Sequence, residues 1–241
     1  MKVLLVILFF ILPSFALTND TRVFQKIQKD FDSIIVKDLN NKKLIFSKDE
    51  NQILRPASLT KIMTAMLAIE SGKMNSIVTI TPEMKKVEPT VANFKVGEKF
   101  YLKDLVHAAM IKSANDAANS IAIYLGNGSK QKFVSMMNLK AKKLGMKNTN
   151  FTNPCGFDIG NHSSTANDLL KLTEYAIKNK TFNSIVKLEK YAFNAINTKS
   201  RYMVHSSNKL LSNEPYIVGI KTGYTNKAGA CLIARAKNSS K

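Results

Sequence analysis

A serine and a lysine three residues apart begin an apolar helical pattern in the stretch "RPASLTKIMTAM", residues 55–66. Residues with this spacing on a helix face the same way, with about 5–6 Å between their Cβ atoms. Ser58 falls in the predicted first turn, where unpaired N–H groups and the helix dipole favour a developing negative charge. Ser58 can therefore act as a nucleophile with Lys61 as its base, although an ordinary first-turn serine followed by a solvated lysine has the same spacing.

The Ser-x-x-Lys pattern is weak by itself, because this lysine-rich chain repeats it at Ser58/Lys61, Ser129/Lys132, Ser184/Lys187 and Ser206/Lys209. Two other groups distinguish the first pair. Ser113-Ala114-Asn115 interrupts two predicted helices, and Lys221-Thr222-Gly223 occurs once, inside a predicted strand. Ser-x-Asn also occurs at Ser206–Asn208, so the order of the three motifs, each in its expected setting, carries the inference.

The residue types suit nucleophilic catalysis by serine. A serine hydroxyl is a poor nucleophile at neutral pH and needs a neighbouring base. Lys61 can be that base only when it is neutral. Burial and a second cation nearby, which we expect to be Lys221, would both lower the pKa of Lys61 from its ordinary value of about 10.4.

Hydrophobic periodicity and turn residues predict the elements that position these groups. We expect a hairpin over 32–51 around Asn40-Asn41, and extended chain from Tyr191 to His205. Two final strands, "IVGIKTGYT" and "GACLIARA", are expected to flank a turn at Asn226-Lys227. The predicted helices cover 57–70, two segments that break near 112–115, 130–145, and 163–179, the last with a capping box of Thr165 and Asp168.

Strands at both chain ends with helices between them predict an α+β domain whose antiparallel sheet joins the two ends. No repeat, low-complexity tract or linker divides the chain, so we expect a single domain. Its helices should form clusters around the sheet.

The first 16 residues, "MKVLLVILFFILPSFA", have a basic start, a short apolar run and a small-x-small site. This pattern is typical of a secretory signal peptide, and the run is too short to span a bilayer. We expect the domain to occupy 17–241 and to be exported to the periplasm or the outer face of the cytoplasmic membrane.

The net charge of +19, from 36 basic and 17 acidic residues, is spread along the chain. Without a long basic run or a nucleic-acid motif, this distribution argues against nucleic acid as a partner. Export argues the same way. An anionic lipid or envelope polymer fits better, with a loose association at a membrane surface.

Cysteine and histidine positions argue against metal chemistry. His107, His162 and His205 are isolated and no H-E-x-x-H motif is present, so we expect no metal and no cofactor. The histidines lie in no triad motif either. Cys155 and Cys231 form no C-x-x-C motif, and a disulfide between them is left open.

Five segments, "PASLTKIMTAM", "SANDAANSIA", "FTNPCGFD", "STANDLL" and "GIKTGYTNKAGACLIA", resemble the D-alanyl-D-alanine carboxypeptidases. These low-molecular-weight penicillin-binding proteins trim peptidoglycan stem peptides. The similarity runs from about Val23 to Ala236, and its three motifs are those of penicillin-binding proteins. The resemblance implies the penicillin-binding-protein/β-lactamase-like transpeptidase fold, a stem peptide ending in D-Ala-D-Ala as substrate, and covalent inhibition by β-lactams.

The resemblance also implies roles for the catalytic residues. Ser58 would form the acyl-enzyme with Lys61 as base. Ser113 would pass the proton to the leaving D-alanine amine, and Asn115 would hold Lys61 and the substrate amide.

The family's substrate-binding roles fall on the last motif. Lys221 and Thr222 would bind the terminal carboxylate, and Gly223 would let the substrate lie against the strand. The N–H groups of Ser58 and Tyr224 would form the oxyanion hole.

Several alternatives remain open. The Ser-Ala-Asn form of the second motif and the absence of an E-x-x-L-N segment argue against a class A-like β-lactamase, and a D,D-endopeptidase is a further alternative.

Relatives continue beyond "ARAKNSSK" with a strand that should lie between the N-terminal hairpin and the last strand. We therefore expect a catalytic domain truncated at its C-terminus, with two exposed strand edges. An inactive, peptidoglycan-binding relic is then a rival to the enzyme. Cys155 stands where related chains often have His or Ser.

Overall fold

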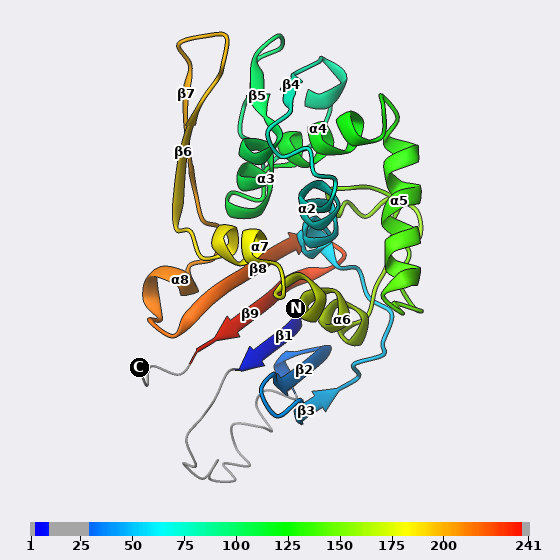
Figure 1. Cartoon of the computed structure of the whole chain (residues 1–241). Coiled ribbons are helices and arrows are strands. Elements are labelled where there is room, and N and C mark those ends of the chain that lie inside the picture. Colours follow the sequence, from blue (N-terminus) through cyan, green and yellow to red (C-terminus); the bar gives the residue numbers. More distant parts are fainter. Residues whose placement is uncertain (1–2, 10–28, 238–241) are drawn as a thin grey trace.

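A five-stranded sheet built from both chain ends underlies the molecule (Figure 1). The computed structural model describes residues 3–9 and 29–237. The strand order is β3-β2-β1-β9-β8. The bounds are β1 Val3–Phe9, β2 Ser33–Asp38, β3 Leu44–Lys48, β8 Ile217–Thr225 and β9 Gly229–Ala236. The α+β class with a sheet made by both chain ends is confirmed.

Two antiparallel hairpins form the outer parts of this sheet, β2 with β3 and β8 with β9. The predicted turn at Asn40-Asn41 is present, where the Asp38 carboxylate accepts hydrogen bonds from the backbone N–H groups of Asn40 at 2.8 Å and Asn41 at 3.3 Å. Such side-chain-to-backbone bonds are the reason that Asp and Asn favour turns.

Strand β1 lies between the two hairpins and pairs in parallel with both β2 and β9. The expectation of two exposed edges at this position is therefore wrong for the chain that carries Val3–Phe9. The run "VLLVILF" is continuously apolar, which is typical of a central parallel strand. The same residues fall in the predicted signal peptide, whose cleavage stays a prediction.

In Figure 1 the helices between residues 61 and 143 lie above the sheet. The predicted helical segments are present, whereas the short helices at Glu83–Lys85, Lys180–Val186 and Leu210–Asn213 were not predicted. The interruption near 112–115 separates α3 from α4, and the Thr165 hydroxyl caps α6 by accepting from Asp168 N at 3.1 Å. The helical bounds are η1 Ala57–Thr60, α2 Lys61–Glu70, η2 Glu83–Lys85, α3 Leu102–Ile111, α4 Asn115–Leu125, α5 Lys130–Lys143, α6 Ala166–Ala176, α7 Lys180–Val186 and α8 Leu210–Asn213.

Two small hairpins complete the fold. Strand β4 (Ile77–Thr79) pairs with β5 (Lys99–Tyr101), and β6 (Lys190–Asn194) pairs with β7 (Arg201–His205). The extended chain expected from Tyr191 to His205 is this second hairpin. Within the described residues, none of the helices has the length and apolar character needed to cross a membrane.

Helix α2 runs through the middle of the core. Its buried residues are Lys61, Ile62, Met63, Thr64, Ala65, Met66 and Ala68, which cover every face of the helix. A helix that is apolar on all sides is stable only when other elements surround it. The burial of α2 therefore fixes the position of the serine one turn before it.

Removing residues 1–16 should lower the free energy of unfolding by about 2 kcal/mol or more, because β2 and β9 would each lose a ladder of hydrogen bonds. Val6→Pro in the full chain should act in the same direction, since a central strand does not accommodate proline. Urea unfolding of the three proteins would measure this. Equal midpoints would show that the sheet does not depend on β1.

Candidate active site

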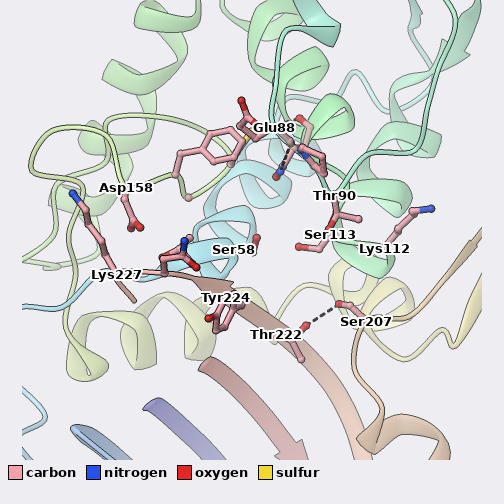
Figure 2. Close-up of a pocket in the computed structure, with 18 of the residues that line it drawn as sticks. Ser58, Glu88, Thr90, Lys112, Ser113, Asp158, Ser207, Thr222, Tyr224 and Lys227 are labelled. Carbon is pink, nitrogen blue, oxygen red and sulfur yellow. Dashed lines mark hydrogen bonds between the residues drawn. The ribbon is translucent and has the colours of Figure 1, made fainter. Parts of the chain in front are cut away.

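The three predicted motifs meet at one cleft of about 880 Å³ (Figure 2). Ser58 comes from the turn before α2, Ser113 and Asn115 from the junction of α3 and α4, and Thr222, Gly223 and Tyr224 from β8. The two lysines are not among the described residues that line the cleft. Both are buried, with Lys61 0% and Lys221 1% exposed.

Lys61 lies against the hydroxyl of Ser58. Its Nζ is 2.8 Å from Ser58 Oγ and also donates to the carbonyl of Cys155 at 2.7 Å. A buried amine needs such partners, because its desolvation is costly. The pair has the geometry that proton transfer from the serine to the lysine requires.

Burial lowers the pKa of Lys61 from 10.5 to about 8. Burial, and then the charge of Lys61, lower the pKa of Lys221 well below its ordinary value. From the sequence we expected burial and Lys221 both to lower the pKa of Lys61. Burial does lower it, whereas the repulsion between the two amines lowers the pKa of Lys221. Two amines in one buried site titrate as a coupled pair.

A buried histidine supports the turn that carries Ser58. His162 Nε2 lies 2.8 Å from Thr60 Oγ1, and Thr152 N donates to His162 Nδ1 at 3.0 Å. Nδ1 is therefore the acceptor, and Nε2 donates to the threonine. Burial lowers the pKa of His162 to about 4, so the ring is neutral at neutral pH. Sequence reasoning gave His162 no role, because a single histidine without a motif has no distinctive signal.

The loop 153–157 packs directly on the backbone of Ser58. Asn153 Oδ1 accepts from the N–H groups of Cys155, Gly156 and Phe157 at 3.1, 2.8 and 2.9 Å, which fixes the loop. Gly156 has φ +94°, and a Cβ there would lie 1.9 Å from the carbonyl oxygen of Ala57. The family resemblance included this segment, but the sequence did not identify the carbonyl of Cys155 as a partner of Lys61.

Ser113 and Asn115 occupy the break between α3 and α4. Ser113 has φ +64°, a left-handed conformation that is uncommon for serine. Asn115 donates through Nδ2 to the carbonyl of Glu88 at 2.8 Å, and through its backbone N–H to Thr90 at 2.7 Å. Among the described residues no hydrogen bond joins Asn115 to Lys61, so that expected contact stays a prediction.

Strand β8 forms the opposite wall and is an edge strand of the sheet. A Cβ on Gly223 would lie 2.9 Å from Ser58 N and 3.1 Å from Ala57 Cβ. Only glycine lets the strand approach the serine this closely. Tyr224 is 67% exposed and leaves the cleft open to solvent.

The hydroxyl of Thr222, which we predicted to bind substrate, lies next to a second hydroxyl. Thr222 Oγ1 and Ser207 Oγ lie 2.7 Å apart, and both residues line the cleft. Lys221 donates to the carbonyl of Thr222 at 2.8 Å instead. The predicted carboxylate contact therefore has Thr222 at the surface of the cleft and Lys221 behind it.

Cys155 and Cys231 are both buried thiols with no disulfide between them. Cys155 lies beside Lys61, and its Sγ donates to the carbonyl of Asn115 at 3.4 Å. Burial raises the pKa of the Cys155 thiol to about 11. The thiol therefore stays protonated and packs as a small apolar group.

A serine bonded to a buried lysine, a second serine across the cleft and an edge strand together define a serine acyl-transfer site. Residues 20–241 match the profile of the D-alanyl-D-alanine carboxypeptidase family, peptidase S11. The chain belongs to this family.

Similar proteins with known names support this family assignment. The chain is 32% identical over 234 residues to D-alanyl-D-alanine carboxypeptidase DacF of Bacillus subtilis, covering 93% of this chain and 59% of that protein. It is 32% identical over 209 residues to a D-alanyl-D-alanine endopeptidase of Escherichia coli, covering 84% and 66%. It therefore spans about two thirds or less of the length of these two proteins.

Solved structures share the fold. The DD-transpeptidase of Streptomyces K15 superposes with a TM-score of 0.78 at 29% identity, covering 83% of this chain and 82% of that one. A D-alanyl-D-alanine carboxypeptidase, DacD of Francisella tularensis, gives a TM-score of 0.78 at 25% identity, covering 85% and 62%. The penicillin-binding-protein-like fold is confirmed.

Gly223→Ala should reduce acylation by a β-lactam by about 10²-fold or more, because the added methyl displaces the Ser58 N–H from its position against β8. Stopped-flow acylation rates would measure this. Gly72→Ala is the control, because φ is +70° there but nothing lies within 4 Å of the added Cβ. Unchanged acylation in Gly223→Ala would contradict the close packing.

Proposed function

We propose that this chain is a serine D-Ala-D-Ala carboxypeptidase that removes the terminal D-alanine from peptidoglycan stem peptides. The observation that carries the proposal is the 2.8 Å contact between Lys61 Nζ and Ser58 Oγ, made by a fully buried amine. Membership of the family supports the substrate class. The proposal covers the activity of the whole protein, of which the sequence can be a part.

Acylation begins when neutral Lys61 takes the proton from Ser58 Oγ. The oxygen then forms a bond to the carbonyl carbon of the penultimate D-alanine. The N–H groups of Ser58 and Tyr224 stabilise the resulting oxyanion, and such donors are worth about 10²–10³ in rate.

Release of the terminal residue is the next step. The C–N bond breaks, and the leaving amine of D-alanine receives a proton through Ser113 from the protonated Lys61. Water then attacks the acyl-enzyme at the same carbon, and the proton that it loses restores the Ser58 hydroxyl. Asp158 and Glu88 are the acidic residues among the described residues of the cleft lining.

The unpaired edge of β8 supports binding of the substrate as an added strand. An extended peptide bonds to such an edge through its main chain, and glycine at 223 leaves room for it. The terminal carboxylate lies at Thr222, and the hydroxyl of Ser207 is beside it. This arrangement favours substrates with a free C-terminus.

An endopeptidase that cuts cross-links is the second candidate, because the E. coli relative named as an endopeptidase is 32% identical to this chain. The two activities share the acyl-enzyme and differ in the group that leaves from the scissile bond. Release of D-alanine from a pentapeptide, compared with cleavage of a purified cross-linked dimer, distinguishes them.

We propose further that the protein is exported, from the signal-like pattern in residues 1–16 and the substrate class. Peptidoglycan lies outside the cytoplasmic membrane, so the periplasm or the outer face of that membrane is the expected location. The charge of +19 supports a loose association with anionic surfaces.

A fluorescent penicillin should label Ser58, and Ser58→Ala should abolish the labelling. Lys61→Ala should slow it by about 10²-fold or more, since general-base catalysis contributes about 10²–10⁴. Ser184→Ala and Lys187→Ala are matched controls, because they alter another Ser-x-x-Lys pair outside the cleft. Peptide mass spectrometry identifies the labelled serine. Label retained in Ser58→Ala would end the proposal.

The acylation rate should depend on pH through Lys61. Because the pKa of Lys61 is lowered to about 8, its neutral fraction rises about tenfold from pH 6 to pH 7 and levels off above pH 8. The rate constant for acylation by a penicillin should track this curve. Circular dichroism at each pH checks that the fold is unchanged. A flat profile between pH 6 and pH 8 would show that Lys61 is not the base.

A further inference from the structure

Asp158 is an acidic side chain of the cleft whose hydrogen-bonding capacity is not met. It lines the same cleft as Ser58 and is 16% exposed. Its Oδ1 is buried and accepts no hydrogen bond from any described residue. Arg55 Nε lies 3.9 Å from this oxygen, which is beyond hydrogen-bond distance. Arg55 therefore compensates the negative charge only in part, and the 16% of the side chain that is exposed belongs to atoms other than Oδ1.

The loop around Asp158 is held at both ends. Before it, Gly156 N and Phe157 N donate to the side chain of Asn153. After it, the Arg55 guanidinium donates to the carbonyl of Gly160 at 3.0 Å. Figure 2 shows the Asp158 carboxylate pointing into the cleft. A preorganised carboxylate of this kind can bind a cation without reordering the loop.

The position of Asp158 along the cleft indicates which part of a peptide it meets. In Figure 2, Asp158 and Lys227 lie on one side of Ser58, and Thr222 and Ser207 lie on the other. A peptide whose carboxylate lies at Thr222 and whose scissile bond lies at Ser58 runs antiparallel to β8. Its residues before the scissile bond then extend towards Asp158.

We propose that Asp158 binds the side-chain ammonium group of a diamino acid that directly precedes D-Ala-D-Ala in the substrate. The inference rests on the proposed function and adds a specificity determinant to it. Stem peptides carry lysine or diaminopimelate at this place. The lysine side chain ends in an ammonium group, and the last carbon of diaminopimelate carries an ammonium group together with a carboxylate. The net charge of +19 favours an anionic polymer as substrate. A carboxylate that points into the cleft would repel such a polymer unless it binds a cationic group of that polymer.

The expected gain is modest, because the pair is partly open to solvent. Exposed ion pairs contribute up to about 1 kcal/mol and partly buried ones somewhat more, which corresponds to about three- to tenfold in specificity. The preference should fall as salt is added, since screening weakens charge pairs that solvent reaches.

The test compares two peptides that differ only in this charge, Nα-acetyl-L-Lys-D-Ala-D-Ala and its Nα,Nε-diacetyl form. D-alanine release gives kcat/KM for each. The wild-type enzyme should favour the free amine about three- to tenfold, and Asp158→Asn should bring the ratio close to one. Glu88→Gln removes the other acidic side chain among the described lining residues and should keep the preference.

Three results would overturn the proposal: a ratio near one in the wild type, a preference that survives Asp158→Asn, or an equal loss in Glu88→Gln. If the Asp158–Arg55 pair has only a structural role, Asp158→Asn should lower the unfolding temperature and slow D-alanine release from both peptides by the same factor. A peptide with diaminopimelate in place of lysine tests the other source of the ammonium group. Its advantage in kcat/KM should also be lost in Asp158→Asn.

Binding separates this inference from the proposed function. Calorimetry on Ser58→Ala, with the same peptides, measures the charge preference without any chemistry. If the wild type neither releases D-alanine nor reacts with penicillin, the proposed function fails, while the ratio of the two Kd values still tests Asp158. Equal Kd values for the two peptides would reject the inference alone.

Discussion

The burial of one lysine amine governs the rest of this structure. Taking an ammonium group out of water costs several kcal/mol, and only two acceptors, Ser58 Oγ and the carbonyl of Cys155, offset that cost for Lys61 among the described residues. The amine is held there because α2 is packed on every face. The same desolvation lowers the pKa of Lys61 to about 8, so the packing of the core also makes available the neutral amine that can accept the serine proton.

Two close backbone approaches then complete the cleft. Gly156 brings the loop 153–157 against Ala57, and Gly223 brings β8 against Ser58 N. The loop supplies the carbonyl that accepts from Lys61, and the strand supplies an open edge. Because both contacts are between main chains, the side chains on these segments remain available for recognition, and Asp158 is one of them.

The motifs and the element order could be predicted because each has a local cause. The apolar spacing predicted α2, and turn residues predicted the hairpin around Asn40-Asn41. The segment resembling the family included Cys155, but nothing in its residue type indicates that its carbonyl, rather than its thiol, meets Lys61. Sequence reasoning also gave no role to His162, because its partner Thr60 is 102 residues away along the chain. The pairing of β1 with β2 and β9 depends on contacts between opposite parts of the chain, which periodicity does not report.

Ala57 and Ser113 beside the cleft have left-handed backbone conformations, with φ of +46° and +64°, and these conformations lower the thermal stability of the protein. Each such residue costs about 1–2 kcal/mol, and glycine would relieve most of it, less the entropy that glycine adds to the unfolded chain. Glycine at 113 would remove the second hydroxyl, and glycine at 57 would remove the methyl that packs beside Gly223. Selection for heat resistance alone would thus erode the site, and a more durable version of this protein has to gain its stability elsewhere in the fold.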